Sequence, residues 1–348
     1  MINMFKKGSN FILLFFAAII SSCTPPKSFY KMEGSINLRN KINKIIENSE
    51  IDLNMSIQVI SLKDNKVIYD YNSQKLLMPA STNKLYTCAA ALHFLEKDHQ
   101  FGTDVFSDTK NLILKGGGDP DLSIIELDSL ALEVSKKYKN IDTLFIDDTF
   151  LDSLNYGEGW MWDEGPWWYA APISALSVND NCIDFYIKPG PAGKAASIDY
   201  YPKTSFIKLK NESITVQDSV QKRLKIDRDW VLNKNNFNAY GEINDTSGLD
   251  TLYRNIYDPS TFTGVVFKES LEKYGARVKT ISKKKTSNKS YKKVSNHLSK
   301  PLIHSATNLM NESDNLSAEL FVKSIGALDT LPGTWKVGLD SIKSFLAK

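Results

Sequence analysis

The sequence predicts an α+β fold in which a long, mostly β segment is inserted into a domain of helices and strands. Residues 38–95 contain two stretches of helical spacing, separated by two short segments in which apolar and polar residues alternate. Residues 101–250 contain strand-like pieces separated by glycine turns, and helical periodicity returns after residue 258. We therefore expect 37–100 and 251–348 to form one domain, with 101–250 as inserted β-rich subdomains.

Each expected element has a local signature. The pair Asp64-Asn65 between two alternating segments is typical of a hairpin turn, and Pro259 suits the first turn of a helix, where its missing N–H is tolerated. The basic run at 283–285 indicates a solvated loop, with binding to an anionic polymer as a less favoured alternative. In chain order we expect a helix over 38–49, a hairpin over 55–70, a helix over 85–95, strands at 111–114, 143–146, 183–187 and 206–209 with a helix near 124–138 among them, a helix from 258, one helix over 303–325 and an amphipathic segment over 337–346.

The first residues predict export. A short basic region precedes an apolar run over 11–20, which is too short to span a bilayer but suits the core of a signal peptide. Small residues lie directly before Cys23, and this pattern resembles a bacterial lipobox, in which the cysteine becomes the lipid-modified first residue. We expect 1–22 to be a lipoprotein signal peptide and 23–36 a tether, with the chain lipid-anchored on the periplasmic side of the cell envelope. The alternative is an ordinary signal peptide in which Cys23 is incidental.

The composition is that of a globular protein. The chain has 348 residues, of which 42% are hydrophobic and 24% charged, and its net charge of +3 offers no argument for nucleic acid binding. Three cysteines and four histidines show no CxxC or HxxxH spacing, so a structural zinc site is not expected. Cys88 and Cys182 could pair in an oxidising envelope, and a buried free thiol is the equally weighted alternative.

A candidate nucleophile lies at the start of a predicted helix. In Ser81-Thr82-Asn83-Lys84 the serine and the lysine are three residues apart, so both lie on one helix face. A serine hydroxyl needs a base, and a lysine can be that base when burial or nearby positive charge lowers its pKa. A helix start also directs amide dipoles toward a developing oxyanion. Ser-x-x-Lys occurs at seven other places, and a plain helix cap with a surface lysine is the alternative; Pro79 and the apolar run after Lys84 distinguish this copy.

A second motif is Ser313-Asp314-Asn315. In serine acyl-transferases of the Ser-x-x-Lys type, a second Ser-x-Asn places a hydroxyl and an amide in the cleft. The hydroxyl can relay a proton to the leaving amine, and the amide can hold the substrate backbone. The same pattern at 177–179 shows that the motif is weak by itself, and a polar helix cap is the alternative.

Together these motifs resemble the class C low-molecular-mass penicillin-binding proteins, a family of D-alanyl-D-alanine carboxypeptidases and endopeptidases. The resemblance runs in unbroken order from about residue 37 to 348. Ser313 follows Ser81 by 232 residues, an interval that accommodates inserted domains as in this family, whereas a class A β-lactamase keeps the motifs much closer. The matching segments are LMPASTNKL at 77–85, LKGGGDPDL at 114–122, GWMWDE at 159–164, AAPISA at 170–175, NLMNESDNLSAEL at 308–320 and LPGTW at 331–335.

The resemblance implies a transpeptidase/β-lactamase-like domain, with an antiparallel sheet between helices, and a serine hydrolase that cleaves peptidoglycan stem peptides through an acyl-enzyme. It also implies β-lactams as covalent inhibitors, and it implies no metal or organic cofactor. By the same resemblance, Ser81 is the nucleophile, Lys84 its base, and Ser313 and Asn315 complete the proton relay and the substrate contacts. The carboxylate that recognises the amino end of the stem's diamino acid is implied as Glu164 by position, or as its neighbour Asp163, with a solvated turn as the alternative.

The family's third motif, Lys-Thr-Gly, has no counterpart. None of the Lys-Thr pairs at 203, 279 and 285 is followed by glycine, and the sequence stops 35 residues after Ser313. In the family the missing segment supplies central strands of the sheet. We therefore expect an incomplete product of an active family member, which can leave this chain inactive. One rival is a non-catalytic lipoprotein that binds the cell wall with the same fold, and another is a β-lactamase, against which the motif interval argues.

Overall fold

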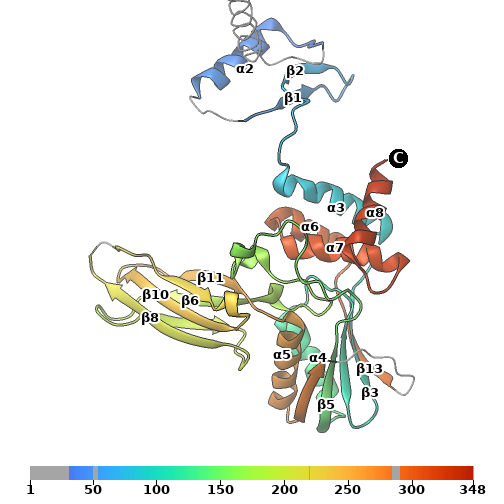
Figure 1. Cartoon of the computed structure of the whole chain (residues 1–348), viewed down its shortest axis with the longest axis vertical. Coiled ribbons are helices and arrows are strands. Elements are labelled where there is room, and N and C mark those ends of the chain that lie inside the picture. Colours follow the sequence, from blue (N-terminus) through green and yellow to red (C-terminus); the bar gives the residue numbers. More distant parts are fainter. Residues whose placement is uncertain (1–30, 50–53, 219, 284–290, 348) are drawn as a thin grey trace, which may run out of the picture. The chain divides into compact units, whose positions relative to one another are not determined.

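The structure is a computed structural model that describes residues 31–49, 54–218, 220–283 and 291–347. The chain divides between Ala80 and Ser81 into two compact units (Figure 1). Among the described residues, no helix is both long and apolar enough to cross a bilayer.

The first unit holds one helix and one hairpin. Helix α2 (Ile36–Asn48) begins at Ser35, whose hydroxyl accepts a hydrogen bond from the Leu38 amide at 3.2 Å. Strands β1 (Ile57–Ile60) and β2 (Val67–Tyr71) pair antiparallel, as predicted, and Asn65 has the positive φ of 55° that such a turn needs. Helix α2 buries none of its side chains, so this unit has little core of its own.

A five-stranded mixed sheet forms one part of the second unit. The strand order is β12-β5-β4-β3-β13, with β4, β5 and β12 parallel and β3 and β13 antiparallel to their neighbours. The inward residues Leu112, Leu114 and Leu144 are fully buried beneath two helices. The bounds are β3 (Gly102–Ser107), β4 (Leu112–Gly116), β5 (Asn140–Asp147), β12 (Arg277–Lys283) and β13 (Lys292–Leu298), with helices α4 (Ile124–Ser135) and α5 (Pro259–Lys273).

Local chemistry explains where the two covering helices begin. Ser123 and Glu126 form a reciprocal capping box at the start of α4. Asp258 caps α5 by accepting from the Thr261 amide, and Pro259 occupies the first helical position, as the sequence predicts. The apolar faces of both helices then close over the sheet.

Two three-stranded sheets form a second body of this unit. Their orders are β11-β6-β7 and β8-β10-β9, and the rings of Phe185 and Phe237 meet between them with centroids 5.1 Å apart. Figure 1 shows the two sheets lying together with one end beside α5, where the rings of Phe206 and Phe262 have centroids 5.5 Å apart. The bounds are β6 (Cys182–Lys188), β7 (Ser197–Tyr201), β8 (Lys208–Val216), β9 (Lys225–Arg228), β10 (Asn236–Asn244) and β11 (Asp250–Asn255).

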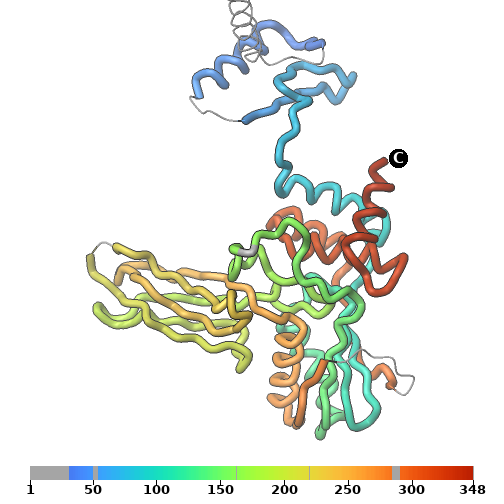
Figure 2. Tube along the Cα trace, viewed as in Figure 1, coloured from blue at the N-terminus to red at the C-terminus, as the bar shows by residue number. Residues whose placement is uncertain are grey.

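Four α-helices form a further part of the second unit (Figure 1). They are α3 (Lys84–Phe94), α6 (Leu302–Glu312), α7 (Asn315–Asp329) and α8 (Trp335–Leu346). Their apolar faces share one core, in which Phe101 and Phe321 are fully buried and stack with centroids 6.1 Å apart. Figure 2 shows the segment that follows β5, in green, running between these helices and the sheets.

The structure differs from the sequence-based expectation in two places. The single helix expected over 303–325 is two helices, because Ser313 adopts a left-handed conformation with φ 56° and ends α6. Residues 250–298, expected mostly with the second part of the divided domain, supply β11 to one sheet of the inserted region and β12 and β13 to another. Because of this strand pairing, the β-rich region continues beyond residue 250.

Candidate active site

Ser81 and Lys84 lie where the chain enters α3. Ser81 is exposed in a turn of 3₁₀ helix over Ala80–Asn83, and Lys84 is the first residue of the α-helix. The Lys84 Nζ lies 3.2 Å from the Ser81 Oγ. The spacing of three residues therefore brings the amine to the hydroxyl, as the helical geometry predicts.

The junction of α6 and α7 completes the group around this amine. Lys84 Nζ donates to the Ser313 carbonyl oxygen at 3.0 Å, to the Ser313 Oγ at 3.3 Å and to the Asn315 Oδ1 at 2.5 Å. The left-handed Ser313 ends α6, and Asp314 begins α7 by accepting from the amides of Leu316 and Ser317. The break between the helices thus turns the serine and the asparagine toward Lys84.

Burial changes the acidity of this lysine. Lys84 is only 8% exposed, and its desolvation lowers the pKa of the amine below the ordinary value of 10.5. The negative charges of Asp314 and Glu319 act in the opposite direction, but burial dominates. A lysine with a lowered pKa can accept a proton from an adjacent serine, so the arrangement is suited to nucleophilic acyl transfer.

A third segment reaches the group through Asn315. Its side-chain amide donates to the Tyr169 carbonyl oxygen at 2.8 Å. The loop that carries Tyr169 is held by the buried Asn255 amide, which lies within 3.0 Å of the carbonyl oxygens of Gly165, Trp167 and Ala170. The sequence did not indicate Tyr169, which acts through its backbone, or Asn255, which lies at the end of an unremarkable strand.

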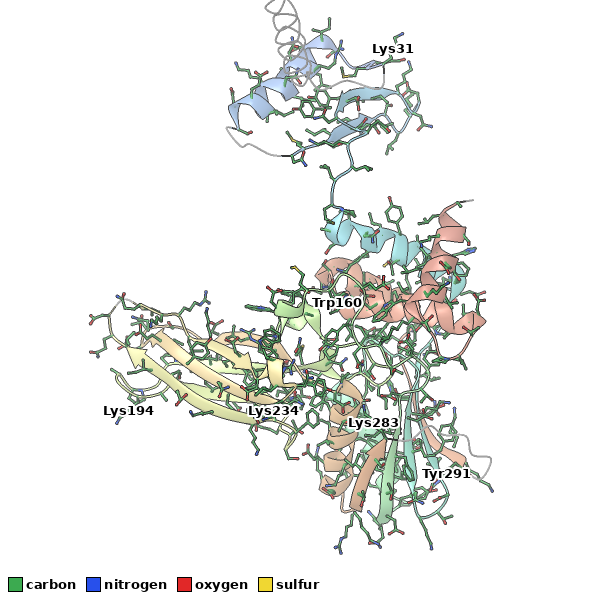
Figure 3. The ribbon with its side chains drawn as sticks, in the orientation of Figure 1. Lys31, Trp160, Lys194, Lys234, Lys283 and Tyr291 are labelled. Carbon is green, nitrogen blue, oxygen red and sulfur yellow. The ribbon has the colours of Figure 1, made fainter. Side chains whose placement is uncertain are left out.

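The two carboxylates expected to recognise substrate lie on the neighbouring segment. Asp163 is exposed, and Glu164 is half-buried with its Oε2 accepting from the Met161 amide at 3.3 Å. Glu164 also lines a cavity of about 380 Å³ with aromatic walls. The cavity is further lined by Tyr156, Trp160, Arg228 and Trp230, and Trp160 is labelled in Figure 3. The structure therefore brings Ser81, Lys84, Ser313 and Asn315 together, and it places Glu164, but not Asp163, in the lining of a separate cavity.

The remaining predicted residues do not join this group. Cys23, the predicted lipidation site, lies outside the described residues. Cys88 and Cys182 are both buried and both free thiols. Within the described ranges, no cluster of three or more His, Cys, Asp or Glu side chains could hold a metal ion.

Comparison with known proteins identifies the family of this chain. The sequence profile of the D-Ala-D-Ala carboxypeptidase 3 (S13) family matches residues 38–348. A D-alanyl-D-alanine carboxypeptidase of Actinomadura sp. (strain R39) is 29% identical over 330 residues, covering 89% of this chain and 61% of that protein. The D-alanyl-D-alanine carboxypeptidase DacB of Haemophilus influenzae is 26% identical over 332 residues, covering 90% of this chain and 67% of that protein.

Solved structures confirm the fold that the sequence motifs predict. Penicillin-binding protein 4 (dacB) of H. influenzae matches with a TM-score of 0.72 at 23% identity, covering 84% of this chain and 67% of that chain. A structure of the same protein complexed with a β-lactam matches with a TM-score of 0.65 at 21% identity, covering 85% of this chain and 66% of that chain. This chain thus spans about three fifths to two thirds of the length of the proteins it matches. Together with the profile match, these likenesses show that the chain belongs to the D-Ala-D-Ala carboxypeptidase 3 (S13) family.

Proposed function

We propose that this protein is a serine-type D-alanyl-D-alanine carboxypeptidase and endopeptidase that cleaves peptidoglycan stem peptides through an acyl-enzyme. The observation that carries the proposal is the Lys84 amine, which lies within hydrogen-bond distance of Ser81, Ser313 and Asn315 and is shielded from water. The family membership and the names of its relatives support the same reaction.

The geometry suggests how the first half of the reaction proceeds. Ser81 Oγ attacks the carbonyl carbon between two D-alanines while its proton passes to Lys84 Nζ. Amides at the start of α3 stabilise the oxyanion that forms. The Ser313 hydroxyl, 3.3 Å from the same amine, relays the proton to the leaving amino group, so D-alanine departs and the acyl group remains on Ser81.

The second half returns the enzyme to its starting state. Water attacks the ester on Ser81 while Lys84 accepts a proton from it, and Lys84 returns this proton to Ser81 Oγ as the ester bond breaks. Glu164, or its neighbour Asp163, recognises the amino end of the stem's diamino acid beside the cavity that Glu164 lines. A β-lactam follows the first half only, because opening its ring leaves the whole molecule attached to Ser81.

The first experiment is the intact mass of the purified chain after incubation with benzylpenicillin, beside Ser81→Ala. A persistent gain of one whole antibiotic molecule, absent in Ser81→Ala, is the expected result. If the parent chain gains no mass, the proposed activity fails for this chain, although its family membership stands.

A lipid anchor in the cell envelope is the second part of this proposal. The apolar run that ends in small residues before Cys23 supports it. Expression in bacteria fed a labelled fatty acid should label the protein, and Cys23→Ser should remove the label. Label that persists in Cys23→Ser would exclude this residue as the anchor.

A further inference from the structure

Glu319 lies one helical turn beyond Asn315 on α7, and its carboxylate interacts electrostatically with Lys84. Residues four apart share one face of a helix, so the Glu319 carboxylate points to the same side as the Asn315 amide that binds Lys84. The Glu319 Oε2 accepts a hydrogen bond from the Trp335 indole Nε1–H at 2.6 Å, and the Trp160 indole also bonds to this carboxylate. Two indoles from separate segments therefore fix the position of the Glu319 side chain.

The nearest other cation already has a carboxylate of its own. Lys323, one turn further along α7, is fully buried and donates to Asp152 at 2.6 Å and to the Leu154 carbonyl oxygen at 2.5 Å. Its amine also lies 3.6 Å from the centroid of the Trp335 ring. Lys323 thus has Asp152 as its own partner, and the Glu319 carboxylate interacts with both Lys323 and Lys84.

Lys84, in contrast, has no carboxylate at ion-pair distance among the described residues, and its contacts are neutral oxygens. The carboxylate of Asp314 accepts from the two amides that it caps at the start of α7, and its charge raises the pKa of Lys84 more than the charge of Glu319 does. The groups that face this region are Lys84 and Cys88 from α3, Asp314 and Lys323 from α7, and Asp152 from the loop after β5.

We propose that Glu319 is a positioning residue that acts beside Asp314 as a second acidic counter-charge of Lys84 and ties the segment that carries Trp160 to the helices α3 and α7. The role in catalysis rests on the function proposed above. When Lys84 takes the proton of Ser81, an ammonium forms in a buried place, and the fixed negative charge of Glu319 stabilises it without itself receiving the proton. In the resting state the same charge opposes the fall in the pKa of Lys84 that burial causes.

A first experiment measures the coupling of the two charges without any reaction. The full chain, labelled at the indole nitrogens of its six tryptophans, is titrated by NMR, and Trp335→Phe assigns the resonance that reports on Glu319. Burial raises the pKa of Glu319, whereas the two indole hydrogen bonds and the charges of Lys323 and Lys84 lower it. Because Lys84→Met removes one of these charges, it should move the midpoint upward by roughly one pH unit. Lys336→Met is the matched control, because Lys336 is exposed and pairs with Asp340. A midpoint that Lys84→Met leaves unchanged, or a resonance that does not titrate, would overturn the proposal.

A second experiment follows the pH dependence of acylation by benzylpenicillin. Glu319→Gln keeps an acceptor for the Trp335 indole but removes the negative charge, so the pKa of Lys84 falls. The acid limb of the pH–rate profile for acylation should therefore move to lower pH by roughly one unit. The rate at the high-pH plateau should stay within about threefold of the parent, whereas Glu319→Ala should also lower the plateau because the indoles lose their acceptor. Glu272→Gln, on α5, is the control.

The two experiments separate the two proposals. An acid limb that Glu319→Gln does not move would reject Glu319 as the counter-charge even if the enzyme acylates normally. If the parent chain does not acylate at all, the proposed function fails, and the indole titration in Lys84→Met still decides whether the two charges are coupled.

Discussion

The buried amine of Lys84 contacts the candidate nucleophile Ser81, and its burial should also lower the stability of the fold. Four oxygen atoms from three residues surround it, yet burial still lowers its pKa below 10.5. A lysine whose pKa is lower in the folded than in the unfolded state favours unfolding at neutral pH. This penalty disappears as the pH rises from the folded pKa toward the unfolded pKa. A side chain that is essential for the reaction should therefore destabilise the fold.

Lys84→Met should raise the midpoint of thermal unfolding at pH 7 by about 2–4 °C while abolishing acylation. The methionine fills the same volume and does not bring a charge out of water. Differential scanning calorimetry at pH 7 and pH 10 checks this, because the advantage should shrink at the higher pH. Lys336→Met, at an exposed position, should change neither midpoint. A lower midpoint for Lys84→Met would mean that its hydrogen bonds outweigh the desolvation of its charge.

Asp119 is a second titrating group outside the catalytic set. It is 2% exposed, and desolvation raises its pKa to about 7. Its Oδ1 accepts from the Asp121 amide, and its Oδ2 lies 3.6 Å from the His297 Nε2 without a hydrogen bond. A carboxyl with a raised folded pKa binds its proton more tightly when folded, so stability should fall as the pH rises from 3.8 through 7.

Between pH 6 and pH 8 the ionisation of Asp119 should therefore lower the free energy of unfolding of the parent chain by roughly 1 kcal/mol. Asp119→Asn cannot ionise at this position, so its free energy of unfolding should fall by that much less over the same pH range. Urea unfolding of both proteins at the two pH values measures the difference. Equal losses in the two proteins would show that Asp119 is already ionised at pH 6.

At the scale of elements, the crossing of α7 and α8 depends on glycine. A Cβ at Gly338 would lie 1.9 Å from the Val322 carbonyl oxygen, and one at Gly326 would lie 2.6 Å from the Thr334 carbonyl oxygen. These distances are far shorter than any van der Waals contact, so the two helices approach each other backbone to backbone. Since α7 carries Asn315 and α8 carries Trp335, the crossing also fixes the distance between the catalytic junction and the indole that holds Glu319.

Gly338→Ala should therefore destabilise the second unit by about 1–3 kcal/mol, because the helices must separate to admit the methyl group. Gly248→Ala is the matched control, since a Cβ there meets no atom within 4 Å and the backbone has an ordinary φ. Chemical unfolding monitored by tryptophan fluorescence compares them. If both variants lose the same free energy of unfolding, the close approach of α7 and α8 is not the cause of the destabilisation in Gly338→Ala.

The sequence predicted individual helices and strands more reliably than their assignment to sheets and domains. Periodicity located α2, α3, α4 and α5 closely, because apolar spacing and capping residues act over a few positions. It did not reveal the break at Ser313, because the apolar pattern continues across both helices and only the left-handed backbone of one residue interrupts them. It also could not assign β11, β12 and β13 to their sheets, since strand pairing between segments far apart in the sequence leaves no local signal.

The candidate site shows the same limit at the scale of the whole molecule. Ser81 and Lys84 are neighbours in sequence, and Ser313 and Asn315 lie in a recognisable motif, so these four could be predicted. Their meeting depends on residues 229 and 231 positions apart, which only the folded chain shows. The supporting Asn255 and Glu319 could not be singled out, because their roles come from hydrogen bonds to remote segments.

The two units differ in how much apolar surface they bury, and this difference should appear in hydrogen exchange. No side chain of α2 is buried, and Ile36 and Ile45 are more than two-thirds exposed. In β4, by contrast, Leu112, Ile113 and Leu114 are at most 2% exposed. Local opening requires little free energy where few apolar contacts must be broken.

Amides of α2 and of the β1–β2 hairpin should therefore exchange at least about 100-fold faster than those of β4 and β5 under native conditions. Exchange followed by mass spectrometry on peptides from these elements measures the ratio, and peptides from α4 serve as an internal reference for a well-packed helix. Protection of α2 equal to that of β4 would mean that this unit is stabilised by contacts beyond those in the described residues. Rapid exchange of α2 with slow exchange of β4 would place the most stable part of the chain in the five-stranded sheet and the two helices that cover it.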